Sequence, residues 1–523
     1  MTDRYDIAVV GGGINGAAIA RDAAGRGLRV FLAERADYAN ATSSASSKLV
    51  HGGIRYLEHG EFRLVRESLH ERETLLAIAP HLVTPLRFLL PITSTQPRAA
   101  WKVRIGLALY DLLSGRQRLQ RTGRLQRHEI DTLTGLRRND LRAVLHYPDC
   151  WTDDARLTLS TLLDARARGA VIRNRCEVTG IQPCPAGGYR VELRSQGFRS
   201  GIDARVVVNA AGPWADRLLD RVEGRGGRPP TRLRLVRGSH IVVRTPPGIG
   251  SDAWTLQHTD GRVVFVIPWL GGRYRIIGTT DVTHEGDAAS ARCSTTERDY
   301  LLATVNRFFH HPLRPEDVVW DWSGVRPLVD DGEAEPSKIT RDYRFALERH
   351  GDGALLTVFG GKLTTHRLLA ERALDQLAPI VGPLSAPWTR TAPLAGGDVP
   401  ADQLDAMAAA GPAILPSATR ARLVHTYGST ARALFETVLQ QPLHAREIAP
   451  GIPEVELRHA IDHEDARTAD DFLFRRTKTF IDLAGPDMGA IHIWFGRHVQ
   501  HSPTETSPSV HDPATCGTTE TLR

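Results

Sequence analysis

The chain has 523 residues, of which 41% are hydrophobic and 24% are charged, and this is an ordinary composition for a folded globular protein. Single hydrophobic cores stop growing at roughly 250 to 300 residues, so we expect more than one domain. The formal net charge of +6 suits an anionic substrate or an anionic membrane surface. No long basic stripe is present, which argues against nucleic acid as a partner.

The sequence contains no segment that we expect to cross a bilayer or to direct export. No apolar run reaches the ~18 residues of a membrane span. Residues 1–6 lead directly into a strand pattern and leave no room for a signal peptide, so a cytoplasmic protein is expected. The five cysteines are scattered without any C-x-x-C pair, which predicts reduced thiols and no metal site.

The first forty residues predict one βαβ unit. Residues 6–10 are mostly apolar and β-branched, residues 17–25 form a helix pattern of small residues, and residues 28–33 read as a second strand. Between the first strand and the helix lies Gly11-x-Gly13-x-x-Gly16, where glycines permit a tight turn and a close approach of a pyrophosphate.

An acidic residue at the end of the second strand strengthens this interpretation. Glu34 stands where a carboxylate can accept hydrogen bonds from both ribose hydroxyls of an adenosine, which disfavours NADP. Glycine turns of this form also occur without a ligand. Strand, turn, helix, strand and acid together favour dinucleotide binding, but they do not choose between FAD and NAD.

Later segments complete the predicted architecture. Residues 205–209 and 354–359 read as further strands that end in small residues, so the cofactor domain is assembled from distant segments. Residues 233–243, 262–268 and 274–279 predict an inserted antiparallel sheet that roofs the active site. The pattern breaks at residues 383–400, and residues 401 to about 485 read as helical.

Residues 41–57 (ATSSASSKLVHGGIRYL) form a hydroxyl-rich loop that leads to a Gly-Gly turn and an Arg-Tyr pair. This loop resembles the segment by which flavin-dependent glycerol-3-phosphate dehydrogenases wrap the pyrophosphate and ribityl chain of FAD. Further segments resemble motifs of the same family, in its order: YPDCWTDDARL at 147–157, RGSH at 237–240, GTTD at 278–281, SGVRPL at 323–328 and FGGKLTT at 359–365. The resemblance covers residues 5 to about 485.

The resemblance implies an α/β fold: a Rossmann-like FAD-binding domain of the two-domain, D-amino-acid oxidase-like flavoprotein class, with an inserted antiparallel-sheet substrate domain and a C-terminal helical domain. The expected boundaries are an oxidoreductase body at 1–390, with FAD-binding segments at about 1–70, 150–215 and 325–390 and a substrate domain mainly at 216–324, a helical domain at 391–495, and a disordered tail at 496–523.

The implied activity is oxidation of sn-glycerol 3-phosphate to dihydroxyacetone phosphate, with hydride transfer from C2 to FAD N5 and electrons passed to a membrane quinone. The enzyme would then attach peripherally to the cytoplasmic face of the bacterial inner membrane. Residues 98–113 are a candidate, because Trp101, Ile105, Ala108 and Leu112 can share one helix face. A helix packed against the protein is an equal alternative. A homodimer is a further candidate assembly.

Residue roles follow from the matched motifs. The candidate catalytic residues are His51, His240 and Arg326. The candidate substrate-binding residues are Arg55, Tyr56, His240, Arg326, Lys362 and Thr364. The candidate FAD-binding residues are Gly11, Gly12, Gly13, Asn15, Gly16, Glu34, Thr42, Ser43, Ser46, Ser47, Lys48, Leu49, Gly52, Gly53, Val178, Ala211, Gly212, Gly361, Lys362, Leu363 and Thr364.

The chemistry gives these residues physical reasons. A phosphorylated polyol needs cationic donors, which the arginines and Lys362 supply. Oxidation needs a base for the hydroxyl proton near neutral pH, and either His51 or His240 suits it. Tyr56 and Thr364 can bond the substrate, or can serve in packing and capping.

Three alternatives stay open. A glycerol-3-phosphate oxidase of the same fold would pass electrons to oxygen and make peroxide. An amine or hydroxy-acid oxidase would also want an arginine, but that class lacks the SSASSK run. A non-catalytic FAD-binding sensor would have no reason to hold the histidines, arginines and lysine together.

Overall fold

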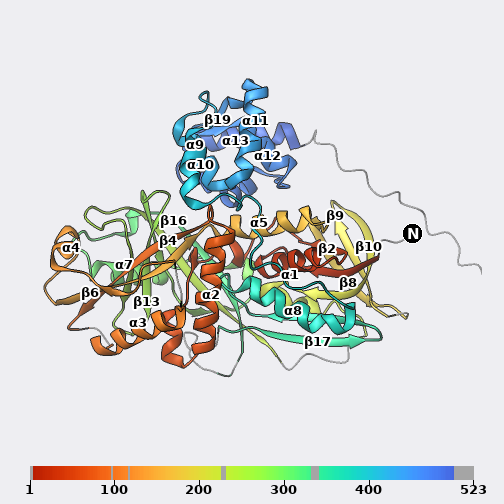
Figure 1. The fold of residues 1–523 in the computed structure, drawn as a ribbon, viewed down its shortest axis with the longest axis horizontal. Helices are drawn as coiled ribbons and strands as arrows, with labels where there is room; N and C mark the ends of the chain where they lie inside the picture. Colours follow the sequence, from red (N-terminus) through yellow and green to blue (C-terminus); the bar gives the residue numbers. More distant parts are fainter. Residues whose placement is uncertain are drawn as a thin grey trace, which may run out of the picture.

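A computed structural model describes residues 4–499, except 96–97, 116–117, 186, 225–230, 331 and 333–340. Figure 1 shows three parts: a sheet flanked by helices on the right, a second sheet on the left, and a helical domain above both. The predicted tail at 496–523 falls largely outside the described residues, as does Cys516, since description stops at residue 499.

The first sheet contains the βαβ unit that the sequence predicted for a dinucleotide-binding domain. Its parallel strands follow the order β18 (Gly353–Phe359), β10 (Phe198–Asn209), β1 (Arg4–Val10), β2 (Val30–Ala33) and β7 (Val171–Arg173). Antiparallel strands complete it: β17 (Arg344–His350) pairs with β18, while β9 (Tyr189–Ser195) pairs with β10 and with β8 (Cys176–Pro183). The predicted strands at 6–10, 205–209 and 354–359 are confirmed.

Helix α1 (Ile14–Gly25) packs against α5 (Asp154–Ala167) and α8 (His366–Val381). Many buried residues of α1 are small, such as Ala17, Ala20 and Ala23, and these let the helix approach its neighbours closely. Helix α8 begins three residues later than the expected start near Leu363, because residues 363–365 form a turn. Residues 361–364 therefore precede the helix.

The second sheet contains the three predicted strands, as β11 (Leu233–Arg244), β13 (Val263–Trp269) and β14 (Tyr274–Gly278). It also includes β12 (Ala253–Gln257), β15 (Val282–Thr283), β16 (Val318–Val329), β3 (Leu49–Val50), β4 (Val83–Thr93), β5 (Gly123–Arg124) and β6 (Leu141–Thr152). The last four precede the predicted insertion. The pairing of β4 with β12 is parallel and the other pairings are antiparallel, so the sheet is mixed.

Short helices cover and connect these sheets. In the body they are α2 (Phe62–Ile78), α3 (Ala100–Ser114), α4 (Arg127–Thr132), α6 (Ala215–Leu219), α7 (Thr295–Asn306) and the 3-10 helix η2 (Ile54–His59). The C-terminal domain has α9 (Leu404–Ala409), α10 (Ser417–Tyr427), α11 (Ala431–Gln440), α12 (Glu454–Asp462), α13 (Gly485–His498), a π-helix at Asp471–Thr477 and the hairpin of β19 (Glu447–Ala449) with β20 (Ile452–Pro453).

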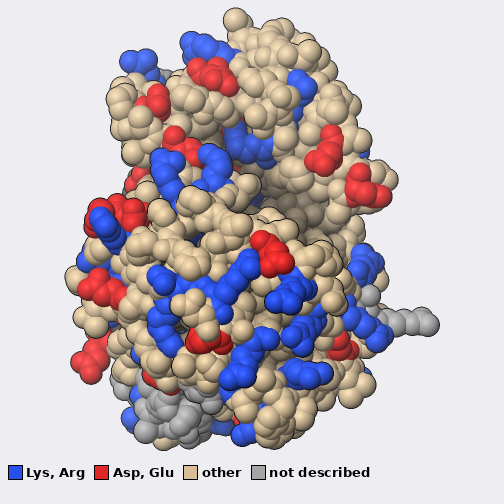
Figure 2. Space-filling view, turned by 90° about the vertical axis from the view of Figure 1, so that its left-hand side faces the viewer, with Lys and Arg blue, Asp and Glu red and all other residues tan. Residues whose placement is uncertain are grey.

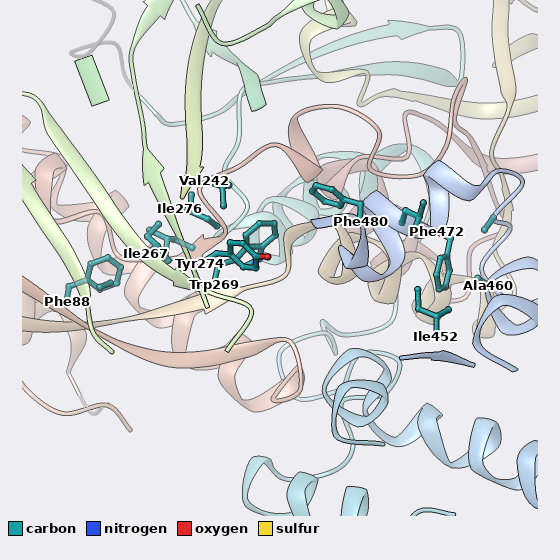
Figure 3. Packing of buried hydrophobic residues seen from close by; sticks show 14 of the residues in the cluster. Phe88, Val242, Ile267, Trp269, Tyr274, Ile276, Ile452, Ala460, Phe472 and Phe480 are labelled. Carbon is teal, nitrogen blue, oxygen red and sulfur yellow. The ribbon is translucent and has the colours of Figure 1, made fainter. Parts of the chain in front are cut away.

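The C-terminal domain shares a hydrophobic core with the second sheet. Figure 3 shows side chains from the sheet, such as Ile267 and Trp269, in one cluster with Ile452, Phe472 and Phe480 of the C-terminal domain. Burial of apolar surface is the main favourable contribution to such packing. The helical domain is therefore part of the folded body and not a tethered appendage.

Buried ion pairs reinforce this contact. Asp37, just after β2, accepts hydrogen bonds from Arg476 at 2.5 and 2.9 Å and from Arg475 at 2.6 Å. Burial opposes ionisation of Asp37, but the two arginines outweigh it and lower its pKa to about 2. Arg156 pairs in the same way with Glu464 at 2.6 Å.

We expect Asp37→Asn to destabilise the protein by about 3 to 5 kcal/mol, because it leaves two guanidinium groups facing a neutral amide at a buried site. The measurement is the midpoint of thermal unfolding in excess FAD. Asp482→Asn is the matched control: Asp482 pairs with the exposed Arg273, and such pairs contribute about 1 kcal/mol or less. Equal losses in the two variants would contradict the interpretation.

Candidate active site

A cavity of about 470 Å³ lies between the two sheets. The loops that follow β1, β2, β10 and β18 line one side of it, and residues of β11 and β16 line another. The carboxyl ends of parallel strands in such sheets are where ligands bind. The cavity therefore lies where the sequence predicts that the cofactor and the substrate bind.

The glycine turn is of the kind that binds a dinucleotide, because its backbone packs so closely that a side chain at Gly11 or Gly16 would collide with neighbouring backbone atoms. Gly11 has a φ of +117°, and a Cβ there would lie 2.5 Å from the Ala210 carbonyl oxygen. A Cβ on Gly16 would lie 1.9 Å from the Gly11 oxygen. This packing brings the amino-terminal end of α1 to the cavity, where its free N–H groups favour a pyrophosphate.

Glu34 stands at the end of β2 and lines the cavity. Its carboxylate accepts hydrogen bonds from the backbone N–H of Gly12 at 2.7 Å and of Ala36 at 2.8 Å. Burial raises its pKa, while these two donors oppose the rise. The carboxylate thus fixes the glycine turn and keeps lone pairs for the ribose hydroxyls of an adenosine.

Hydrogen bonds from distant segments hold the hydroxyl-rich loop in place. Thr42 donates to the Val325 carbonyl at 2.7 Å, and Ser43 Oγ accepts from the Ile14 N–H at 3.0 Å. Ser46 Oγ and Lys48 Nζ both donate to Asp154, each at 2.7 Å. Lys48 is buried in this ion pair, which anchors the loop to Asp154 at the start of α5.

Most residues predicted to bind FAD form the cavity wall. They are Gly11, Gly13, Asn15, Glu34, Thr42, Ser43, Ser46, Ser47, Leu49, Gly53, Val178, Ala211, Gly212, Gly361, Lys362, Leu363 and Thr364. Gly12, Gly16, Lys48 and Gly52 do not line the cavity and lie behind this wall. Among the described residues, Asn15 Oδ1 and Lys362 Nζ are buried without a hydrogen-bond partner, as expected of atoms that face a bound cofactor or substrate.

Cations gather at the end of the cavity formed by the second sheet. Arg326 of β16 donates to Asp281 and, at 2.8 Å, to Thr279 Oγ1. Arg341 also donates to Asp281, at 3.1 Å. Burial opposes ionisation of Asp281, but the arginines outweigh it and hold its pKa below the usual value.

Arg341 was missed by the sequence analysis, because it lies in no recognised motif and reaches the cavity only through the fold. Asp281 lies in the GTTD motif, but no role was predicted for it. That motif was the available signal for a buried partner to Arg326, one of the candidate substrate-binding residues.

Lys362, Tyr56 and Arg55 complete this end of the cavity. Lys362 Nζ lies 3.7 Å from the centroid of the Tyr56 ring. Arg55 Nε is buried without a hydrogen-bond partner among the described residues. Burial raises the pKa of Tyr56, but Lys362 and nearby arginines lower it overall. The four cations Arg55, Arg326, Arg341 and Lys362 exceed the single charge of Asp281, so this pocket suits a phosphate.

The two candidate bases have different surroundings. His240 Nε2 is 2.8 Å from Ser47 Oγ, and its ring stacks on Trp322 with centroids 5.0 Å apart. Burial, with Arg326 and Lys48, lowers the pKa of His240 well below its usual value.

His51 is held through its main chain, and the residue lines the cavity. Its backbone N–H donates to Thr364 Oγ1 at 3.2 Å. Burial and Lys362 lower its pKa, and Asp149 opposes the decrease. Burial thus disfavours the protonated form of both imidazoles, and a neutral imidazole is able to accept a proton.

Residues 6–367 match the family of FAD-dependent oxidoreductases, and residues 387–485 match the C-terminal domain of alpha-glycerophosphate oxidase. The chain is 44% identical to a glycerol-3-phosphate dehydrogenase of Pseudomonas aeruginosa, over 92% of this chain and 93% of the relative. This chain belongs to the FAD-dependent glycerol-3-phosphate dehydrogenase family. Its cofactor is FAD.

One further relative and one solved structure are also similar to this chain. It is 44% identical to D-erythritol 1-phosphate dehydrogenase of Brucella abortus, over 94% of this chain and 97% of the relative. The crystal structure of the glycerol-3-phosphate dehydrogenase from Bacillus halodurans complexed with FAD is 29% identical, with a TM-score of 0.77, and the match covers 95% of this chain and 91% of that chain. The predicted fold class is confirmed.

We expect Gly11→Ala to yield a dehydrogenase-family protein that purifies with little FAD, because the added Cβ would collide with the Ala210 carbonyl at a positive φ. The measurement is the ratio of flavin absorbance to protein. Gly489→Ala in α13 is the control, since no atom lies within 4 Å of a Cβ there. Full flavin content in Gly11→Ala would rule out this role for the turn.

Proposed function

We propose that this chain oxidises sn-glycerol 3-phosphate to dihydroxyacetone phosphate and passes the electrons to a membrane quinone. The observation that carries the proposal is the convergence of Arg55, Arg326, Arg341 and Lys362 on one end of the cavity that FAD fits, beside two histidines. A phosphate requires such donors, and a secondary alcohol requires a base.

The cations bind and orient the substrate. Asp281 holds Arg326 and Arg341 at fixed positions, so that part of the entropic cost of ordering them is already met in the folded protein. Lys362 and Arg55 keep donors without partners among the described residues, which makes them available to phosphate oxygens. Bound FAD supplies the acceptor for the hydride that leaves C2.

His51 is the better candidate for the base. A base becomes positively charged when it takes the hydroxyl proton, so its neighbours decide how favourable that step is. The charged neighbours of His240 are the cations Arg326 and Lys48. For His51, the carboxylate of Asp149 raises the pKa and Lys362 lowers it. His240, held by Ser47, is suited to donate or accept a hydrogen bond at the substrate without taking a full proton.

D-erythritol 1-phosphate is a second candidate substrate. The observation that favours it is the 44% identity to the Brucella abortus enzyme of that name, equal to the identity to the Pseudomonas aeruginosa relative. Both substrates are polyol phosphates, and the same cations would bind either phosphate.

Attachment to the membrane is supported by one face of α3. Leu107 and Tyr110 pack inward, whereas Trp101, Ile105 and Leu112 are 61%, 59% and 75% exposed. Exposed aromatic and aliphatic groups on one helix face are typical of monotopic attachment. Figure 2 shows many Lys and Arg residues over the lower body at the end that carries the second sheet.

No helix in the described part of the chain is long and apolar enough to cross a bilayer. We propose attachment to the cytoplasmic face of the inner membrane, with the exposed apolar face of α3 in the interface. The homodimer stays a prediction.

We expect anaerobic addition of sn-glycerol 3-phosphate to bleach the flavin of the purified protein, while glycerol leaves it oxidised because it cannot engage the cations. D-erythritol 1-phosphate is tested in parallel, and the faster bleaching identifies the preferred substrate. A flavin that neither phosphate bleaches would overturn the proposed function and favour a sensor or another oxidase. On reoxidation, a quinone analogue should outpace oxygen, and peroxide as the main product would show the oxidase alternative instead.

We expect vesicles containing anionic lipid to bind the protein through α3. The triple change Trp101→Ser, Ile105→Ser and Leu112→Ser should weaken co-sedimentation more than tenfold, since each buried side chain contributes about 1.5 to 3 kcal/mol. Phe198→Ser, at an exposed residue on β10, is the matched control and should bind normally. Unchanged binding by the triple variant would exclude α3 as the attachment site.

A further inference from the structure

The turn that carries His51 rests on a buried polar cluster formed by Asp149 of β6, Tyr110 of α3 and Arg72 of α2. The Gly52 N–H, next to His51, is 3.1 Å from Asp149 Oδ1 and 2.9 Å from the Tyr110 hydroxyl. That hydroxyl donates to Asp149 at 2.7 Å. All three side chains are almost fully buried.

Arg72 fixes the carboxylate from the other side. It donates to Asp149 Oδ1 at 3.0 Å and to the Pro148 carbonyl at 2.8 Å. A buried carboxylate with several hydrogen-bond donors has one orientation available to it. The acceptor for the Gly52 N–H is therefore rigid.

The fit around Gly52 is equally restrictive. A Cβ at Gly52 would lie 2.5 Å from both the Tyr110 hydroxyl and a Leu69 methyl carbon. Gly53 then turns the chain with a φ of +76° into η2, which carries Arg55 and Tyr56. The Gly52 peptide, fixed by these contacts, thus sets the direction of His51 on one side and of Arg55 on the other.

Asp149 and His51 both line the cavity, and the N–H that donates to Asp149 belongs to Gly52, the residue next to His51. Among the described residues, the charged groups that shift the pKa of the His51 imidazole are Asp149 from β6, which raises it, and Lys362 from the segment before α8, which lowers it. Asp149 opposes the fall in the pKa of His51 that burial and Lys362 cause. A carboxylate at this place stabilises the imidazolium that forms when a proton arrives.

We propose that Asp149 is the positioning residue for His51: it holds the Gly52 peptide, together with Tyr110, and supplies the counter-charge for the protonated imidazole. The inference rests on the proposed function of His51 as the base. In that step the substrate hydroxyl proton passes to His51 and the C2 hydrogen passes to FAD as a hydride with two electrons. The alcohol thus loses two electrons and two protons in total and becomes a ketone.

The test is the pH profile of anaerobic flavin reduction by sn-glycerol 3-phosphate. Asp149→Asn should lower the high-pH plateau roughly tenfold or more, because a misplaced base is slow. It should also move the acid limb to lower pH by about 1 unit, because His51 loses the charge that favours its protonated form. Tyr110→Phe keeps the charge and loses one hydrogen-bond acceptor for Gly52, so the plateau should fall without movement of the limb.

Glu73→Gln is the matched control. Glu73 accepts a hydrogen bond from the same Arg72 at 3.1 Å but is not hydrogen-bonded to the His51 turn within the described part of the chain, so its profile should match that of the wild type. Thermal unfolding and flavin content are recorded for every variant. A limb that stays in place in Asp149→Asn would overturn the proposal even if the plateau falls, because lost packing alone lowers the plateau.

A second readout does not depend on turnover. Histidine ring NMR of the holoenzyme, with the His51 signal assigned from its loss in His51→Gln, reports the pKa of His51 directly. That pKa should be lower in Asp149→Asn than in the wild type, and an unchanged value would overturn the proposal. If His51→Gln still reduces flavin at the wild-type rate, His51 is not the base and the proposed function fails there, whereas the titration still reports the coupling to Asp149.

Discussion

Three carboxylates in one short segment form buried ion pairs with three different parts of the chain. Asp149, Asp153 and Asp154 each pair with a buried cation from a different part of the chain: Arg72 of α2, Lys478 of the C-terminal domain and Lys48 of the hydroxyl-rich loop, respectively. A buried charge is costly unless it is paired and hydrogen-bonded, so each pair constrains the segment that brings it. The end of β6 and the start of α5 therefore organise the active-site turn, the domain contact and the cofactor loop at once.

This arrangement explains why the helical domain is tied to a site that it does not line. Lys478 is buried against Asp153, and its pKa is lowered to about 8 mainly by burial. Asp153 also caps α5 by accepting from the Arg156 N–H at 3.0 Å, and Arg156 in turn pairs with Glu464. Displacement of the C-terminal domain would leave these charges without partners at the base of the cofactor loop.

The sequence predicted what depends on local pattern. The unit of β1, α1 and β2, the glycine turn and Glu34 follow from spacing along forty residues, and the histidines and most of the cations of the cavity follow from recognised motifs. It could not predict Arg341, because that residue belongs to no motif and meets Asp281 only across the fold. Lys48 shows the converse. Its motif predicted contact with the cofactor, but its ammonium group pairs with Asp154 and does not line the cavity.

The sequence pattern also could not predict that β4 and β6 belong to the second sheet. β4 pairs with β12, 165 residues further along the chain, and β6 pairs with β4, 48 to 69 residues away, so neither pairing leaves a local signal. The same separation decides the chemistry. His51 and His240 are the same kind of residue in the same cavity, and burial lowers the pKa of both imidazoles. Only the fold places a carboxylate beside one and two cations beside the other. A base must be able to become a cation, so the difference in long-range neighbours, and not residue type, separates the proposed base from its companion.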